Sequence, residues 1–279
     1  MKHRKLVLVP VGGLANRMRT ISSATELCKR HNLTLEIIWF KDPALNTSYK
    51  SLFEPITLEN VTIREATFID YFLYDRPRLH NFFIPRLYQM FAFTKCIYEQ
   101  ESLKRFYQND HYLDIATDGR FYLATYVKLI PSDINCANLK PVTEIQSRIE
   151  SLRNKLGKEC IGVHIRRGDN LVSISESPLY SFTSRMDMEI DSNPEVSFYL
   201  ATDSDEVKAE LIERYGNRIT TMNHSADRLS ESGMRDAVIE LYLLTSTKKI
   251  LGSYHSTYSQ IAAELGGIDF EEIRKSADK

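Results

Sequence analysis

The segment Cys160-Ile-Gly-Val-His-Ile-Arg-Arg-Gly-Asp169 decides the fold of this chain. Its first part is mostly apolar and β-branched, which is typical of a strand buried on both faces of a parallel sheet. Arg166 and Arg167 follow at the point where that strand must end. Open parallel sheets bind ligands at the carboxyl ends of their strands. The segment therefore predicts both a buried strand and a binding edge.

The second half of the chain alternates between apolar strands and helical patterns. Further strands are expected at 197–201, 218–222 and 248–252, and helices at 205–215, 234–245 and 256–265. This alternation predicts a doubly wound parallel sheet flanked by helices. The tail after Phe270 is charged, and we expect it to be frayed or helical.

The first half of the chain opens with a βαβ pattern, in which Gly12-Gly13 permits a tight turn after the first strand. Between residues 52 and 121 the pattern is weaker and many residues are aromatic. The elements expected in this half and just beyond it are strands at 6–11, 35–40 and 120–126 and helices at 15–30, 86–93 and 142–156. A strand, a helix and a second strand in this order favour a parallel sheet here too.

Length and composition indicate two folded domains. A chain of 279 residues suits two domains of ordinary size. With 43% hydrophobic and 26% charged residues it can fill their cores, unlike a disordered chain. The expected fold class is α/β, with Rossmann-like domains at residues 1–138 and 139–279, each a parallel sheet flanked by helices.

Charge and cysteine usage exclude several classes of protein. The net charge of -1 and the lack of a long basic run argue against nucleic-acid binding. The cysteines are far apart and fit no metal spacing, which indicates core thiols in a reducing, cytoplasmic compartment; they are Cys28, Cys96, Cys136 and Cys160. The apolar run at 6–11 is too short for a membrane span or a signal segment. The basic start at 1–5 could help peripheral attachment to an anionic membrane.

Two segments favour an anion. Arg166 and Arg167 are costly to bury at a strand end without one, and a guanidinium fork fits a diphosphate. A structural ion-pair network that includes Asp169 is the alternative. Ser256-Thr257 opens a predicted helix, where N–H groups and the helix dipole favour an anion, although the pair could be a plain N-cap. Together the two segments predict a diphosphate that bridges neighbouring strand ends.

Other segments carry weaker signals. Gly12-Gly13 lacks the third glycine of a dinucleotide fingerprint and the lysine of a P-loop. Asp203-Ser-Asp205 could bind a divalent ion, but Asp205 falls where a helix N-cap is expected, and arginine already neutralises a diphosphate. His164 has no cysteine or carboxylate at metal spacing, which favours a hydrogen-bonding role. We therefore expect no metal site.

These segments resemble the motifs of the α1,6- and α1,2-fucosyltransferases and the protein O-fucosyltransferases. His164-Ile-Arg-Arg-Gly-Asp169 resembles their His-x-Arg-Arg-x-Asp motif, 198–203 their second motif and 250–257 their third. The resemblance covers mainly residues 160–265; in the first half only 12–17 resembles the family's glycine-rich loop with asparagine. It implies a GT-B fold of two facing Rossmann-like domains, the first on the acceptor side and the second on the nucleotide side.

The resemblance also implies residue roles. Arg166 would bind the β-phosphate of GDP-fucose, His164 would lie against the nucleotide, and Glu240 would read guanine. Ser256 and Thr257 would contact phosphate. The whole implied nucleotide-sugar site comprises Gly12, Gly13, Asn16, Arg17, His164, Arg166, Arg167, Asp203, Glu240, Ser256 and Thr257.

The implied reaction inverts the donor's anomeric carbon and needs neither metal nor cofactor, because arginine stabilises the leaving charge. Its catalytic residues would be Arg166, with Asp169 and Glu176 as candidates for acid–base help. Asn170 departs from the family, whose α1,6 branch has lysine there, and Glu176 lies near but not at the expected position of a base.

Two alternatives remain open beside transfer of fucose to a glycan. One is a transferase for another nucleoside diphosphate sugar. The other is a non-catalytic module that binds a sugar nucleotide or a glycan. The sequence does not determine the acceptor, the linkage or the oligomeric state.

Overall fold

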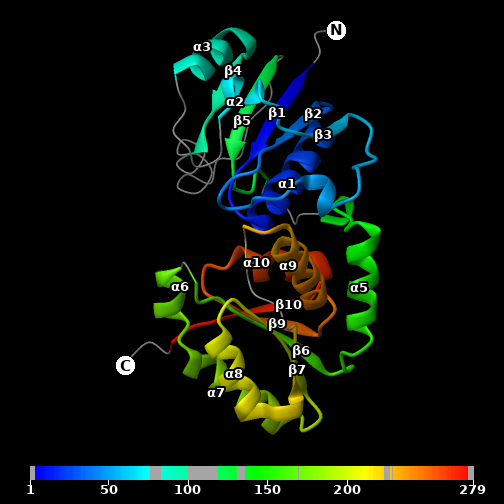
Figure 1. Ribbon diagram of the computed structural model, residues 1–279, viewed down its shortest axis with the longest axis vertical. Helices are drawn as coiled ribbons and strands as arrows, with labels where there is room; N and C mark the ends of the chain where they lie inside the picture. Colours follow the sequence, from blue (N-terminus) through cyan, green and yellow to red (C-terminus); the bar gives the residue numbers. More distant parts are fainter. Residues whose placement is uncertain are drawn as a thin grey trace. The chain divides into compact units, whose positions relative to one another are not determined.

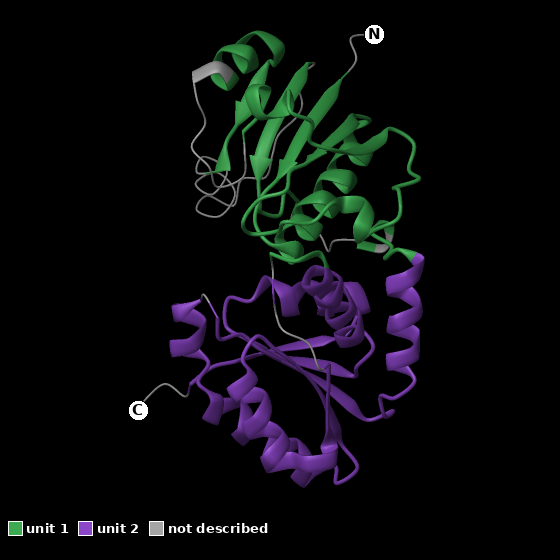
Figure 2. Ribbon diagram, in the orientation of Figure 1, with its two compact units in different colours: residues 1–142, 228–231 green, residues 143–227, 232–279 purple. Residues whose placement is uncertain are grey.

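The computed structural model describes residues 4–75, 83–99, 119–130, 136–168, 170–222, 227 and 229–275. It divides into two compact units, which Figure 2 colours separately: unit 1 is residues 1–142 with 228–231, and unit 2 is residues 143–227 with 232–279. The expected boundary followed residue 138. The structure keeps the next residues in unit 1, because Phe53 pairs with Pro141 and the N–H of Glu54 donates to the carbonyl of Lys140 at 2.8 Å.

Unit 1 is built on a five-stranded parallel sheet of order β3-β2-β1-β5-β4 (Figure 1). Its strands are β1 (Lys5–Pro10), β2 (Thr34–Trp39), β3 (Val61–Glu65), β4 (Lys95–Ile97) and β5 (Arg120–Thr125). Its helices in the described ranges are α1 (Leu14–His31), α2 (Asp70–Leu73) and α3 (Phe83–Ala92), with 3₁₀ turns η1 (Tyr49–Ser51) and η2 (Cys136–Asn138). β1 is central and its apolar residues are fully buried, as a strand covered on both faces must be.

Unit 2 is built on a second parallel sheet, of order β10-β9-β6-β7-β8. Its strands are β6 (Cys160–Ile165), β7 (Ser197–Thr202), β8 (Ile219–Thr221), β9 (Lys249–Ser253) and β10 (Asp269–Ile273). The helices are α5 (Thr143–Arg153), α6 (Leu171–Glu176), α7 (Leu179–Ser192), α8 (Asp205–Tyr215), α9 (Glu231–Leu244) and α10 (Thr257–Gly266), with η3 at Gly216–Arg218. Two parallel sheets flanked by helices confirm the expected fold class.

The residues around Phe270 form a strand, so the expectation of a frayed or helical segment was wrong for the described residues that follow it. β10 pairs in parallel with β9, from Asp269 opposite Lys249 to Ile273 opposite Ser253. Ile273 is buried in the core, whereas Glu271 accepts a hydrogen bond from Arg185 of α7 at 2.7 Å. The charges that suggested a frayed tail are therefore matched within the unit.

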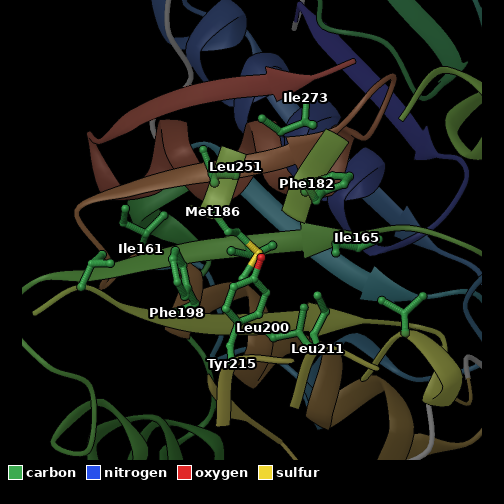
Figure 3. Packing of buried hydrophobic residues seen from close by; sticks show 13 residues of the cluster. Ile161, Ile165, Phe182, Met186, Phe198, Leu200, Leu211, Tyr215, Leu251 and Ile273 are labelled. Carbon is green, nitrogen blue, oxygen red and sulfur yellow. The ribbon is translucent and has the colours of Figure 1, made fainter. Parts of the chain in front are cut away.

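The core of unit 2 lies between the sheet and helices α7 and α8. Figure 3 shows Phe182 and Met186 of α7 and Leu211 and Tyr215 of α8 against the apolar side chains of β6 and β7. Burial of each such side chain contributes about 1.5–3 kcal/mol. Alternate residues of β6 point to the other face, where α9 and α10 pack (Figure 1).

In each sheet, the strands that follow the central strand along the chain are added first on one side of it and then on the other. β1 has β2 on one side and β5 on the other, and β6 likewise has β7 and β9. Successive crossovers leave such a central strand in opposite directions, which opens a crevice at its carboxyl end, the usual ligand site of open α/β sheets.

Three thiols lie in the cores as expected. Cys28, Cys136 and Cys160 are buried and Cys96 is half-buried, all as free thiols. Burial raises the pKa of Cys28 to about 12 and that of Cys160 to about 11, so both stay protonated. Among helices in the described ranges, none has the length and apolar character needed to cross a bilayer.

Candidate functional site

The loops after β6 and β9 emerge side by side from the carboxyl edge of unit 2. The two strands pair in parallel, with His164 opposite Gly252. Just beyond, the N–H of Arg166 donates to Oγ of Ser253 at 3.0 Å. The two segments that the sequence marked as favouring anions are therefore neighbours at the switch point of this sheet.

Asp203 follows β7, and its carboxylate binds backbone N–H groups of the loop after β6. Its carboxylate accepts from the N–H of Arg167 at 2.6 Å and from the N–H of Gly168 at 3.0 Å. A Cβ on Gly168 would lie 2.9 Å from Oδ2 of Asp203, so the glycine permits this close approach. The sequence analysis assigned Asp203 to the nucleotide site. In the structure its carboxylate binds the backbone of the loop that carries Arg166.

The neighbouring aspartate, Asp205, lies at the surface near Lys208, with 3.7 Å between Oδ1 and Nζ. Asp205 begins α8 with its side chain 89% exposed, and the expectation that it caps this helix was wrong. Ser204 is the N-cap, and its hydroxyl accepts from the N–H of Val207 at 3.3 Å. Within the described ranges, no three His, Cys, Asp or Glu side chains are grouped to hold a metal ion.

The Arg167 side chain also stabilises this loop, through hydrogen bonds to backbone carbonyls. Its guanidinium donates to the carbonyl of Arg166 at 2.9 Å and to the carbonyl of Ser177 at 3.0 Å. Burial lowers the pKa of Arg167, and the charge of Asp203 opposes that shift. Arg166 is half-exposed, as Arg167 is, and both its N–H and its carbonyl are held by neighbouring residues. The backbone that positions its guanidinium is thus fixed on both sides.

His164 projects from β6 toward the first turn of α10. Its Nδ1 lies 3.2 Å from Oγ of Ser259 and 3.3 Å from Oγ of Ser256, and its ring stacks on Tyr258 with centroids 4.9 Å apart. Ser256 is the N-cap residue of α10, but its side chain makes no capping hydrogen bond. The Ser256 hydroxyl faces His164, so it does not satisfy the N–H groups of the first turn, which favour an anion.

Gly252 makes this packing possible. A Cβ at this position would lie 2.6 Å from Oγ of Ser259 and 2.5 Å from the ring of Phe270. The glycine therefore lets α10 approach β9 closely enough for Ser259 to reach His164. Thr257, the first residue of α10, is half-exposed beside these groups.

The remaining predicted residues of unit 2 lie in different surroundings. Glu240 is a nearly buried carboxylate on α9. Burial chiefly, and then the charge of Glu240, raise the pKa of Tyr199 on β7 well above its ordinary value. Glu176 ends α6, and its carboxylate pairs with Nζ of Lys275 at 3.1 Å. Asp169 lies outside the described residues.

The glycine-rich loop of unit 1 is tightly folded. Gly12 has φ of 87°, in the left-handed region that favours glycine, and a Cβ there would lie 3.0 Å from Nδ2 of Asn16. Gly13 follows as the N-cap residue of α1. Asn16 is half-exposed and accepts from Nη2 of Arg19 at 3.2 Å.

Arg17 points into the interior of unit 1. Its side chain is fully buried, and its guanidinium donates to the carbonyl of Gly12 at 2.8 Å and to Oδ2 of Asp42 at 2.7 Å. A third bond, at 2.6 Å, reaches the carbonyl of Phe40. The sequence placed Arg17 among the nucleotide contacts; the structure makes it the anchor that ties the glycine loop to the end of β2.

Two serines of this region had no role assigned from the sequence. Ser259 stands three residues after Ser256, a spacing that places both on one face of a helix and could have identified it. Ser177 has no comparable signal, because its contacts lie far away in the sequence.

Comparison with known proteins shows which solved structures share this fold. No protein-family model matches the sequence, and no curated protein matches it. Among solved structures, the NodZ alpha-1,6-fucosyltransferase soaked with GDP-fucose matches with a TM-score of 0.65 and 18% identity, over 95% of this chain and 93% of that chain. A further NodZ structure comes from Bradyrhizobium.

Two other fucosyltransferases match as well. A mutant FUT1 of Arabidopsis thaliana in complex with GDP has a TM-score of 0.63 and 13% identity, over 97% of this chain and 70% of that chain. POFUT1 in complex with GDP has a TM-score of 0.55 and 11% identity, over 98% and 99%. The chain therefore has the two-unit α/β fold of the GT-B fucosyltransferases, as its motifs predicted.

Proposed function

We propose that this chain is a metal-independent, inverting glycosyltransferase that transfers fucose from GDP-fucose to a glycan acceptor. The observation that carries the proposal is the position of Arg166 beside the start of α10, at the switch point of unit 2. The fold supports it, since the structures described above are fucosyltransferases, of which one NodZ structure was soaked with GDP-fucose and the FUT1 and POFUT1 structures are in complex with GDP.

Unit 2 would bind the donor. The Arg166 guanidinium offers a planar fork to the β-phosphate, and the first turn of α10, with the Thr257 hydroxyl, offers further donors. His164 lies against the nucleotide, held by Ser256 and Ser259. Arg167 and Asp203 support the loop, and Gly12, Gly13 and Asn16 of unit 1 would complete the nucleotide-sugar site, with the Gly12 carbonyl held by the Arg17 guanidinium.

In the reaction, an acceptor hydroxyl attacks the anomeric carbon of fucose opposite the departing GDP. The new C–O bond forms as the bond to the β-phosphate oxygen breaks, and GDP leaves with the electron pair. Arg166 stabilises the charge that develops on that oxygen. The hydroxyl proton passes to a base, for which Asp169 and Glu176 are the candidates. We place this activity in the cytoplasm, where free thiols persist.

Calorimetric titration with GDP, UDP and ADP, with and without a metal chelator, tests the proposal. We expect GDP alone to bind, equally well with the chelator present. Incubation with GDP-fucose should then release GDP, faster when a suitable glycan is added. Binding that needs a metal, or a preference for another base, would contradict the proposed donor chemistry.

Glu240 is expected to select guanine, because its carboxylate can accept from N1 and N2 of that base. Glu240→Gln should lower the preference for GDP over UDP by roughly 10- to 100-fold, since a hydrogen bond to a charged group contributes about 1.5–3 kcal/mol. Calorimetry with both nucleotides measures this. The control is Glu210→Gln on the exposed face of α8, and equal preferences in the two variants would remove the assignment.

A non-catalytic sugar-nucleotide module is the second candidate, and the pairing of Glu176 with Lys275 favours it. Such a module would bind GDP-fucose with the same dependence on Arg166 and would release no GDP in the presence of any acceptor.

A further inference from the structure

Ser177, the residue after α6, connects three segments of unit 2. Its side chain is fully buried. Its hydroxyl accepts from the N–H of Tyr254 at 2.8 Å and donates to the carbonyl of Ile273 in β10. Its own carbonyl accepts from Nη2 of Arg167 at 3.0 Å. One residue thus holds the loop after β6, the loop after β9 and the end of the last strand.

These two loops are the ones that carry the proposed phosphate contacts. Arg167 also donates to the carbonyl of Arg166, so it transmits the position of the serine to the diphosphate-binding arginine. Tyr254 lies between Ser253, which accepts from the N–H of Arg166, and Ser256, the N-cap residue of α10. Loss of the serine hydroxyl would release the loop after β9 from β10, because the N–H of Tyr254 and the buried carbonyl of Ile273 would both lose a hydrogen bond.

Resting on the proposed function, we propose that Ser177 is a positioning residue for the donor diphosphate. It holds Arg166 and the first turn of α10 at the separation that a bound diphosphate spans, with no contact of its own to the donor. The strand β10 is part of this arrangement, because Ile273 fixes the direction of the serine hydroxyl.

The experiment compares GDP with GMP, which lacks the β-phosphate, in calorimetric titrations of the wild type and Ser177→Ala. We expect the wild type to prefer GDP, and the variant to lose roughly tenfold in GDP affinity while GMP affinity stays close to the wild-type value. The matched control is Ser181→Ala. Its Oγ is buried and has no hydrogen-bond partner within the described part of the chain, so this change removes a hydroxyl but no bond.

The outcomes separate the two proposals. A wild type that does not prefer GDP overturns the proposed function and this role with it. A wild type that prefers GDP, with an unchanged preference in Ser177→Ala, overturns the positioning role alone. An equal loss of affinity for GDP and GMP in Ser177→Ala would mean that the serine is merely structural, and it would also overturn the positioning role.

A second variant keeps the proposal falsifiable if Ser177→Ala fails to fold. Arg167→Met removes the link to the serine carbonyl and leaves the hydroxyl bonds in place. It should narrow the preference for GDP over GMP in the same way, and an unchanged preference would overturn the proposal.

Discussion

Arg17 in unit 1 and Arg166 in unit 2 each follow the central strand of a parallel sheet, yet the first is fully buried and the second is half-exposed. Arg17 finds two carbonyls and the carboxylate of Asp42 around its guanidinium. In unit 2 the corresponding carboxylate, Asp203, accepts from the loop backbone instead. The comparison teaches that the acceptors around an arginine, and not its place after a strand, decide whether its guanidinium is enclosed in the fold.

The largest effect is expected from removing the anchor. Arg17→Met should lower the free energy of unfolding by about 3–5 kcal/mol, because it leaves the Asp42 carboxylate buried without its cation. Urea denaturation measures the change. The control is Arg30→Met on the exposed end of α1, where loss of the surface pair with Glu26 should cost less than about 1 kcal/mol. Similar losses in both variants would mean that burial does not distinguish these arginines.

The matching change in unit 2 should act on the reaction and not on the fold. Arg166→Ala is expected to reduce the rate of fucose transfer by about 10²–10³-fold, since it removes the charge that stabilises the departing phosphate. Its free energy of unfolding should stay within about 0.5 kcal/mol of the wild type. Arg214→Ala, at the exposed end of α8, is the control and should transfer at the normal rate. Normal transfer by Arg166→Ala would remove the central claim.

A smaller effect is expected at the carboxylate beneath the Arg166 loop. Asp203→Asn replaces one acceptor oxygen with an amide that cannot accept from the loop N–H groups, so it should cost about 1–3 kcal/mol of stability. GDP affinity should fall as well, because the loop loses its fixed position. Asp191→Asn, on the exposed end of α7, provides the control for both measurements. A loss of GDP affinity with no loss of stability would instead indicate a direct contact with the nucleotide.

The central strands of both sheets could be predicted because their apolar runs are continuous. β1 and β6 need no partner to be recognised, since burial on both faces dictates their composition. β10 could not be recognised, because Glu271 and its neighbours look solvent-exposed until Arg185 of another element is placed beside them. The elements between residues 52 and 121 are short edge strands and helices with many aromatic residues, for which local pattern is a poor guide.

The proximity of the two anion-favouring segments could be predicted from the sequence, because it depends only on the order of the strands. Arg166 and Ser256 come together because β6 and β9 are neighbours. The burial of Arg17 was not predictable, since its carboxylate partner lies 25 residues further on. The supporting role of Asp203 was hidden for a similar reason: its contacts are with backbone N–H groups 35 and 36 residues away, which leave no mark on side-chain composition.

The parallel pairing of β10 with β9 also has a consequence for biosynthesis. Ile273 must leave the ribosome before the Ser177 hydroxyl can donate to its carbonyl. At about 5–20 residues per second, the chain between β6 and β10 takes roughly 5–20 s to synthesise. During that interval β6, its arginines and the first helices of unit 2 exist without the strand that completes them. A nascent chain can therefore form much of the sheet before β10 is made, and the Ser177 hydroxyl can link the loop after β9 to β10 only once that strand is in place.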